Sequence, residues 1–404
     1  MLPDGWKLSM IEDMASVSSG GTPSRDNQAY WGGDIPWVTT SEIKKGVIFD
    51  TEQKITKEGL SNSSAKLYPI DTLLMAMYGQ GKTRGQVAKL GIDASTNQAC
   101  AAIIFNELCD VDYYHYFLQS RYDFIRNMAN AGGQENLSAG IIKGIQIPVP
   151  PLPEQKKIAQ ILSTWDNAIS DTERLLENSQ QRKKALMQQL LTGKKRLPGF
   201  EGEWRKLSLG SLFKRVLTRN NGQSDNVVTI SGQHGLISQK EFFKKSVASE
   251  ILDGYYLLVK GQFAYNKSYS NGYPMGAIKR LNRYENGVVT TLYICFELID
   301  ESNVCGDFFE QYFESGILNR GISQIAHEGG RANGLLNVKP SDFFSLRIFI
   351  PELEEQQTIA KVLTTADQEI VALQKRLDHL KQEKKALMQQ LLTGKRRVQV
   401  EEVA

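Results

Sequence analysis

The twelve residues KKALMQQLLTGK occur twice in this chain of 404 residues, at 183–194 and again at 384–395. Shifting the sequence by 201 positions aligns 154–194 with 355–395 without a gap, and 22 of those 41 positions are identical. Chance does not produce a match of this length. We therefore expect an internal duplication. Such a repeat is a stronger guide to the fold than any local sequence pattern.

Both copies of the repeat are predicted to be long helices. Pro153 stands where a first helical turn tolerates proline, and Gly193 and Gly394 follow the last apolar position, where helices often end in glycine. Apolar residues recur in steps of three and four, the period of a coiled-coil seam. The predicted seam consists of Ile158, Leu162, Trp165, Ile169, Leu176, Leu186 and Leu190 in the first copy and Ile359, Leu363, Ile370, Leu373, Leu377, Leu380, Leu387 and Leu391 in the second.

The two helices are predicted to pack against each other as an antiparallel coiled coil. A helix of 39 residues is roughly 58 Å long, which exceeds what one domain core needs and favours a spacer. Polar residues interrupt the seam at Thr172, Ser179, Lys183 and Lys384. The alternative is a pair of amphipathic helices that cover separate cores.

The repeats divide the rest of the chain into two globular segments. We predict a first module at 1–153, a long helix at 154–193, a linker at 194–203, a second module at 204–352, a second long helix at 353–394 and a basic and polar tail at 395–404. Short apolar alternations broken by Gly, Asn and Pro predict strands at 72–78, 99–105, 255–259 and 288–296, and helical patterns cover 113–128 and 308–318. The predicted class is α/β (α+β) with a pseudo-two-fold repeat. The module interiors differ almost completely, which suggests one architecture with two specificities.

Composition narrows the class of protein. Hydrophobic residues make up 41% and charged residues 23%, as in globular proteins, and no apolar run is long enough to span a bilayer. The first residues do not resemble a secretory signal. The four cysteines form no close pair, which favours reduced thiols and a cytoplasmic location. The net charge of +3 means that any basic surface is local.

Several motifs together resemble the specificity subunit of type I restriction–modification systems. They are PLPEQ at 151–155, the LLTGK helix endings, GGTPS at 20–24 and YWGGDIPW at 30–37. The second module lacks the last two motifs, and its AYNKSYSNGY at 264–273 resembles another recognition-domain subtype of the same family. The arrangement of module, helix, module and helix extends the resemblance over essentially the whole chain.

The resemblance implies a non-catalytic DNA-binding subunit. Each target recognition domain would read one half of a bipartite site in double-stranded DNA, and the paired helices would set the spacing and dock two methyltransferase subunits. Those partners would methylate adenine N6 with S-adenosylmethionine, and restriction and motor subunits would bring ATP and magnesium. The chain itself is expected to hold no cofactor.

The residues show no catalytic motif of the usual classes. A methyltransferase loop of Asn or Asp, two prolines and an aromatic residue is missing, and AMYGQGKT at 76–83 departs from a phosphate-binding loop at Ala76, where glycine is needed. The four histidines are scattered without metal-ligand spacing. We predict no catalytic residue and no metal site.

Polar residues on loops rich in glycine and asparagine are the predicted DNA contacts, because such side chains bind base edges and phosphates. In the first module they are Thr22, Ser24, Arg25, Thr39, Thr40, Ser41, Tyr78, Gln80, Lys82, Arg84, Asn97 and Gln98. In the second they are Lys214, Arg215, Arg219, Gln233, His234, Asn266, Lys267, Tyr269, Asn271, Tyr273 and Arg331.

Each predicted contact has an alternative as a hydrated loop residue or a turn former, and Asn97 and Asn271 suit turn geometry. Trp31 and Trp37 are expected to pack rather than to stack on bases. The basic tails at 194–196 and 395–397 suit either the negative ends of the helix dipoles or phosphates. The alternative function is a coiled-coil adaptor whose modules bind proteins, which would lack salt-dependent affinity for duplex DNA.

Overall fold

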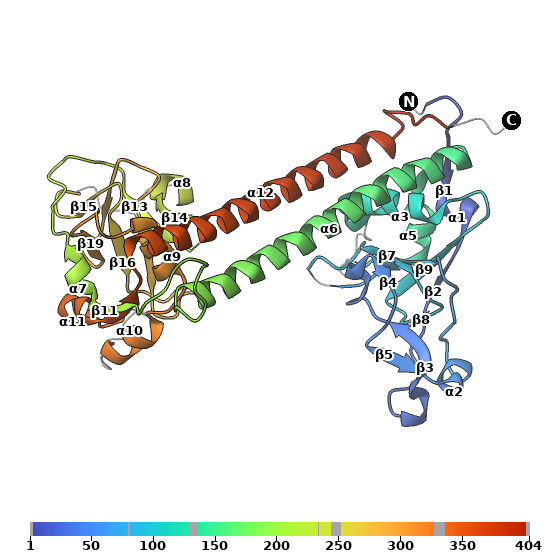
Figure 1. Ribbon diagram of the computed structural model, residues 1–404. Helices are drawn as coiled ribbons and strands as arrows, with labels where there is room; N and C mark the ends of the chain where they lie inside the picture. Colours follow the sequence, from blue (N-terminus) through green and yellow to red (C-terminus); the bar gives the residue numbers. More distant parts are fainter. Residues whose placement is uncertain are drawn as a thin grey trace. The chain divides into compact units, whose positions relative to one another are not determined.

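The computed structural model describes residues 3–79, 81–128, 136–232, 234–243, 252–326 and 336–400. The chain forms two compact units, one made of Met1–Glu173 with Lys375–Ala404 and the other of Arg174–Gln374. Unit 1 holds the first module and unit 2 the second, and each unit includes half of both long helices (Figure 1). Unit 2 is therefore one continuous segment of the chain, whereas unit 1 consists of two segments.

The two long helices are α6 (Leu152–Leu190) and α12 (Leu353–Leu391), each of 39 residues. Helix α6 begins two residues before its predicted start, and both helices end three residues before their predicted ends. Gly193 and Gly394 follow the helix ends with φ of 69° and 71°, the left-handed conformation that favours glycine at a C-terminus. The predicted helix punctuation is confirmed.

Within each unit the two helices pair antiparallel. In unit 1 the Lys384 Nζ lies 2.5 Å from Asp166 Oδ1, and Lys381 Nζ lies 2.7 Å from Glu173 Oε1. As the residue number increases along α6, the number of the residue that it contacts in α12 decreases. In unit 2 the Lys183 Nζ lies 2.6 Å from Asp367 Oδ1, the pair that the 201-residue shift relates to Asp166 and Lys384. The predicted antiparallel arrangement is confirmed.

Every predicted seam residue is buried or half-buried. The polar interruptions also lie on the seam and are not breaks in it. Thr172 is 4% exposed and bonds back to the Ala168 carbonyl at 2.7 Å, and the Ser179 hydroxyl donates to Glu369 Oε1 at 3.1 Å. The Thr172 bond is internal to α6, whereas the Ser179 bond joins α6 to α12 and so helps to fix the register of the pair.

Besides the pair of strands β1 and β10, whose bounds are given below, the described part of unit 1 contains two larger sheets and several short helices. One sheet has the order β2 (Ala15–Ser19), β9 (Cys100–Phe105), β6 (Leu73–Ala76), β7 (Val87–Leu90) and β4 (Val47–Ile48). The other has β5 (Gln53–Ile55), β3 (Trp31–Val38) and β8 (Ser95–Thr96). The helices of the module are α1 (Ile11–Met14), η1 (Gln28–Tyr30), η2 (Ile43–Lys45), α2 (Lys57–Ser61), α3 (Val111–Ser120), α4 (Tyr122–Asn127) and α5 (Ala139–Lys143).

Unit 2 has a four-stranded sheet in the order β12 (Phe213–Arg215), β19 (Ile294–Leu298), β16 (Phe263–Asn266) and β17 (Ala277–Arg280). Two further strand pairs are β13 (Val228–Ser231) with β14 (Gly235–Ser238) and β15 (Tyr256–Val259) with β18 (Asn286–Val289). The helices of the module are α7 (Leu209–Leu212), α8 (Gln239–Phe243), α9 (Gly306–Glu314), α10 (Asn319–Ile325) and α11 (Pro340–Ser345).

Two sequence patterns were each read as one element and prove to be two. The predicted strand at 288–296 comprises the end of β18 and the start of β19, because the chain turns between them, where Tyr293 N donates to Thr290 O. The predicted helix at 113–128 comprises α3 and α4, because Arg121 N donates to both Phe117 O and Leu118 O and so ends α3.

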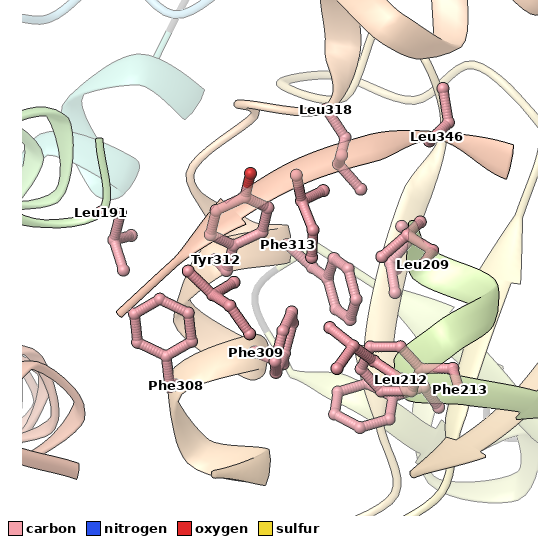
Figure 2. Packing of buried hydrophobic residues seen from close by; sticks show 14 of the residues in the cluster. Leu191, Leu209, Leu212, Phe213, Phe308, Phe309, Tyr312, Phe313, Leu318 and Leu346 are labelled. Atoms are coloured by element: carbon pink, nitrogen blue, oxygen red, sulfur yellow. The ribbon is translucent and has the colours of Figure 1, made fainter. Parts of the chain in front are cut away.

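Each module is anchored to the helix pair by a matching frame. A strand near its start pairs antiparallel with the strand before its long helix, β1 (Lys7–Met10) with β10 (Gln146–Val149) and β11 (Arg205–Ser208) with β20 (Arg347–Ile350). The module cores then continue into the helices. In unit 2 the aromatic side chains of α9 gather with Phe213 and extend toward Leu191, just after α6 (Figure 2).

Candidate nucleic-acid interface

The loop at 20–25, which we call the arginine loop, is held tightly against the first module. A Cβ at Gly20 would lie 2.1 Å from the Thr96 carbonyl oxygen, so a larger residue cannot occupy that position. The indoles of Trp37 and Trp31 donate to the Gly21 and Ser24 carbonyls, both at 3.0 Å. Both tryptophans pack beneath the loop, as expected.

The side chains of the arginine loop meet polar groups from other strands. Thr22 donates to the amide oxygen of the exposed Gln98. Arg25 Nη1 donates to Gln53 Oε1 at 2.7 Å, and its Cζ lies 3.8 Å from the centroid of the Trp31 ring. The structure thus brings three predicted contacts, Thr22, Arg25 and Gln98, onto fixed supports.

The predicted contacts at Thr39 and Ser41 belong to a turn that a buried carboxylate organises. Glu42 is 1% exposed, and its oxygens accept from Thr39 N at 2.8 Å and from Glu52 N at 3.0 Å. The Thr39 and Ser41 hydroxyls lie 2.7 Å apart, and Thr40 is half-buried. Thr39 and Ser41 have partners inside the turn, which supports the turn-former alternative for these two residues.

Asn97 likewise stabilises its own turn. Its Oδ1 accepts from Ala99 N at 3.1 Å, and its backbone N–H donates to the Val38 carbonyl at 3.0 Å. The turn-former alternative therefore accounts for this side chain. The neighbouring Gln98 remains exposed at the surface of the module.

The hairpin after β6 presents only part of its predicted set. Tyr78 is 40% exposed and Lys82 is exposed, whereas Arg84 is only 7% exposed. The hairpin folds against α4, since the Tyr122 hydroxyl donates to the Lys82 carbonyl at 2.7 Å. The expectation that Arg84 is presented at the surface is therefore wrong in this structure, and Gln80 lies outside the described residues.

The same hairpin is not a phosphate-binding loop. Strand β6 is followed by strand β7, whereas a phosphate-binding loop leads from a strand into a helix whose N-terminal N–H groups hold the phosphates. The chain reverses through Gly79, Gly81 and Gly85, which have φ of 137°, 72° and 82°. The glycines thus serve the hairpin geometry.

In unit 2 the predicted contacts near β12 are partly paired. Lys214 Nζ lies 3.1 Å from Glu297 Oε1, and Arg215 is exposed. Arg219 donates to the Gly254 carbonyl, and its Cζ lies 4.9 Å from the centroid of the Tyr256 ring. Arg219 therefore resembles Arg25 in being a surface guanidinium stacked on an aromatic ring.

The segment at 264–273 combines exposed and anchored residues. Tyr269 is 67% exposed and Asn271 is exposed, while Asn266 Oδ1 accepts from Ser268 N at 3.0 Å. Burial foremost, and then the charge of Arg215, lowers the pKa of the half-buried Lys267.

Tyr273 is held in an ionic network. Its hydroxyl bonds to Glu314 Oε1 at 2.5 Å and accepts from Lys279 Nζ at 2.9 Å, and that ammonium also bonds to Glu314 Oε2 at 2.5 Å. The structure thus gives Tyr273 an anchoring role. His234 is exposed, and Gln233 and Arg331 lie outside the described residues.

Sequence reasoning missed the groups that support these loops. Gln53 lies on β5 and reaches the arginine loop because it pairs with Trp37 across the sheet. No local sequence motif predicts that register. Asp166 and Asp367 could have been found, because they are identical in the repeat and occupy polar positions beside the seam.

The basic tails contribute one arginine each to a clamp at a helix end. Arg196 Nε and Nη2 donate to both carboxylate oxygens of Glu355 at 2.6 and 2.7 Å, and Arg397 pairs in the same way with Glu154. These bidentate pairs tie the tail after one helix to the start of the other. Phosphate binding by the other basic residues of the tails, Lys194, Lys195, Lys395 and Arg396, stays a prediction.

Within the described residues, no group of three or more His, Cys, Asp or Glu side chains is placed to hold a metal ion. None of the helices described there is long and apolar enough to cross a bilayer.

Comparison with known proteins shows which proteins this chain is similar to. Residues 3–179 match the family model described as the type I restriction modification DNA specificity domain. Over 425 residues the chain is 25% identical to the type I restriction enzyme MjaVIII specificity subunit of Methanocaldococcus jannaschii, covering 98% of this chain and 94% of that protein. It is 29% identical over 175 residues to the MjaIX specificity subunit of the same organism, covering 42% of this chain and 40% of that protein.

The fold agrees with these matches. The crystal structure of the type I restriction–modification S subunit from M. genitalium superimposes with a TM-score of 0.58 at 14% identity, and the match covers 97% of each chain. Residues 3–179 thus match a type I restriction modification DNA specificity domain, and over nearly its whole length the chain is similar in sequence to a specificity subunit of a type I restriction enzyme and in fold to an S subunit.

Proposed function

We propose that this chain is the sequence-specific DNA-binding subunit of a type I restriction–modification complex, and that each module reads one half of a bipartite site. One observation carries the proposal. The two units share a helix frame down to matching ion pairs, Asp166 with Lys384 and Asp367 with Lys183, whereas their loops differ in sequence and structure. A common frame with different loops suits two readers of different half-sites.

In this proposal the paired helices fix the distance between the half-sites and dock two methyltransferase subunits. Those subunits bind S-adenosylmethionine and methylate adenine N6, while restriction and motor subunits use ATP and magnesium. The chain performs no chemistry and needs no cofactor of its own. A cytoplasmic location stays a prediction.

The spacing role is tested by lengthening both helices by one heptad. Seven residues inserted after Glu173 and seven after Gln374 preserve the seam period, and those two positions correspond under the 201-residue repeat. The insert adds about 10 Å at 1.5 Å per residue, which is about three base pairs of DNA. Sequencing the methylated genome of a strain that carries the variant and its partner methyltransferase should show a gap wider by about three base pairs.

Insertion of the same heptad into α6 alone is the matched control, because it shifts α6 against α12 and should abolish methylation. A variant with both insertions that methylates at the original gap would contradict the spacing role. The protein-binding adaptor makes a separate prediction, namely no duplex affinity that falls with salt. Titrating the unmodified chain with duplex DNA at two salt concentrations distinguishes the two functions.

A further inference from the structure

The arginine loop at 20–25 is a rigid support. The indoles of Trp31 and Trp37 each donate to a carbonyl of the loop, at Ser24 and Gly21. Trp37 is 2% exposed, and the two rings meet edge to face with centroids 5.0 Å apart. The loop therefore rests on a fixed aromatic base and has little freedom to rearrange on binding.

Arg25 lies on this base with its plane held in place. Its Cζ is 3.8 Å from the centroid of Trp31 and 5.0 Å from that of Trp37, a cation–π arrangement. Its Nη1 donates to Gln53 Oε1 at 2.7 Å. A stacked face and a bonded edge together restrict the guanidinium, so a ligand at the remaining edge orders less side-chain freedom.

The free edge of the Arg25 guanidinium offers donors and no acceptor. A guanidinium only donates, so its bond to Gln53 requires the amide oxygen of Gln53 to face Arg25. Within the described part of the chain, Gln53 is the one acceptor recorded for the Arg25 guanidinium, and the Arg25 side chain is exposed. The remaining N–H groups of Arg25 therefore point to a ligand with two adjacent acceptors.

We infer that Arg25 reads a guanine in the half-site of the first module, by donating to O6 and N7 in the major groove. The inference rests on the proposed function. Guanine is the base whose major-groove edge presents two acceptors side by side, whereas adenine adds a donor and cytosine presents a donor. A phosphate also presents two acceptors to a guanidinium, but such a contact carries no dependence on the base, and the test below distinguishes the two ligands by that dependence.

The test compares R25K and R25A with the unmodified full-length chain. The bases read by the unmodified chain are first defined by selection from random duplex DNA. R25K keeps the charge and loses the fork, so it should reduce discrimination at one guanine of one half-site by about 5- to 150-fold, the range for one bidentate base contact. Preference at the other half-site should remain.

A modified base locates the contact. Placing 7-deazaguanine, which lacks the N7 acceptor, at that position should weaken binding of the unmodified chain and leave R25A unaffected. R219K is the matched control, because Arg219 is also stacked on a ring but belongs to unit 2. It should leave the preference of the first half-site unchanged. Equal thermal midpoints for R25K and the unmodified chain establish that the variant is folded.

Two results overturn the inference. In the first, R25A weakens binding to every sequence equally and reduces the salt dependence by about one ion, as a phosphate contact does. In the second, R25K and R25A retain full guanine preference. Failure of the proposed function is seen earlier and separately, as an unmodified chain that selects no sequence at all.

Discussion

Units 1 and 2 use the same contacts to hold a module on the helix pair, although the modules differ. Gln155 Oε1 accepts from Asp110 N at the start of α3 at 2.7 Å, and Gln356 Oε1 accepts from Cys305 N at the start of α9 at 3.0 Å. Both glutamines are 0% exposed. The shared contacts lie where each module packs against its helices. The duplicated sequence therefore specifies how a module is attached to the helices, and the rest of the module can differ.

Helices α3 and α9 show what varies. Tyr116 and Gln311 occupy the same position when residues are counted from the start of each helix. Each forms a hydrogen bond to the aspartate beside the seam of its own unit. The Tyr116 hydroxyl donates to Asp166 Oδ2 at 2.7 Å, and Gln311 Nε2 donates to Asp367 Oδ2 at 2.8 Å. The same hydrogen bond is thus donated by a tyrosine hydroxyl in one unit and by an amide in the other.

The largest expected difference between the units is how their stability depends on pH. The residue before Tyr116 is His115, and the residue before Gln311 is Glu310. Burial lowers the pKa of His115 to about 4, so protonation disfavours folded unit 1 as pH falls from about 6.5 toward 4. The loss approaches about 3 kcal/mol at 1.36 kcal/mol per pKa unit. Burial raises the pKa of Glu310, so unit 2 gains stability as pH falls through that raised pKa.

Hydrogen exchange of peptides from α3 and α9 between pH 7 and 4, corrected for intrinsic rates, measures both trends. The variants H115Q and E310Q isolate the two groups, and each should flatten the pH dependence of its own unit only. Identical slopes for H115Q and the unmodified chain in α3 would show that His115 is not the group responsible.

A smaller effect is expected at the seam ion pairs. Asp166 and Asp367 are 44% and 40% exposed, so each pair with its lysine is partly screened and contributes about 1 kcal/mol. In unit 1 the Lys384 ammonium also lies 5.0 Å from the Tyr116 ring centroid, where unit 2 has Gln311. A cation–π contact adds about 0.5–1 kcal/mol at such sites.

Double-mutant cycles should therefore give a larger coupling for Asp166 with Lys384 than for Asp367 with Lys183. The cycles use D166N with K384M and D367N with K183M, with unfolding free energies from urea titration. Y116F keeps the ring and removes the hydroxyl, so the excess coupling should survive in that background. Equal couplings in the two units would exclude a contribution from the ring.

The architecture could be predicted because a long sequence repeat specifies the two paired helices. The seam period, Gly193 and Gly394 fixed the helices to within three residues. The strand interpretation was wrong at 288–296, because a turn between two strands of different sheets interrupts the apolar pattern without glycine or proline at 290–293. Local patterns do not reveal such a change of sheet.

The candidate site was less predictable, because exposure depends on tertiary contacts. The same hairpin has Lys82 exposed and Arg84 buried, although both are basic and two positions apart. Tyr273 resembled a surface contact, but Lys279 and Glu314 from other elements bind its hydroxyl. Residue type identified the loops, and only the packing of neighbouring helices and strands determines which side chains face outward.

The smallest expected effect is the difference in stability between replacing Trp6 and replacing Trp204, the tryptophans at the two helix ends. A Cβ at Gly394 would lie 3.4 Å from Trp6, and one at Gly193 would lie 3.3 Å from Trp204, so the indoles occupy matching places. Trp6 Nε1 donates to Glu154 Oε2 at 3.2 Å, whereas Trp204 Nε1 is buried and has no hydrogen-bond partner among the described residues.

Replacing each indole by phenylalanine should therefore have unequal costs. W6F loses a hydrogen bond to a carboxylate and should lower the unfolding free energy of unit 1 by about 1 kcal/mol. W204F removes a buried donor that has no acceptor, a gain that offsets the smaller packed area, so unit 2 should change by less than about 0.5 kcal/mol. Urea midpoints from hydrogen exchange in each unit measure both values. A cost for W204F as large as that for W6F would mean that packing, and not the hydrogen bond to Glu154, explains why an indole stands at each helix end.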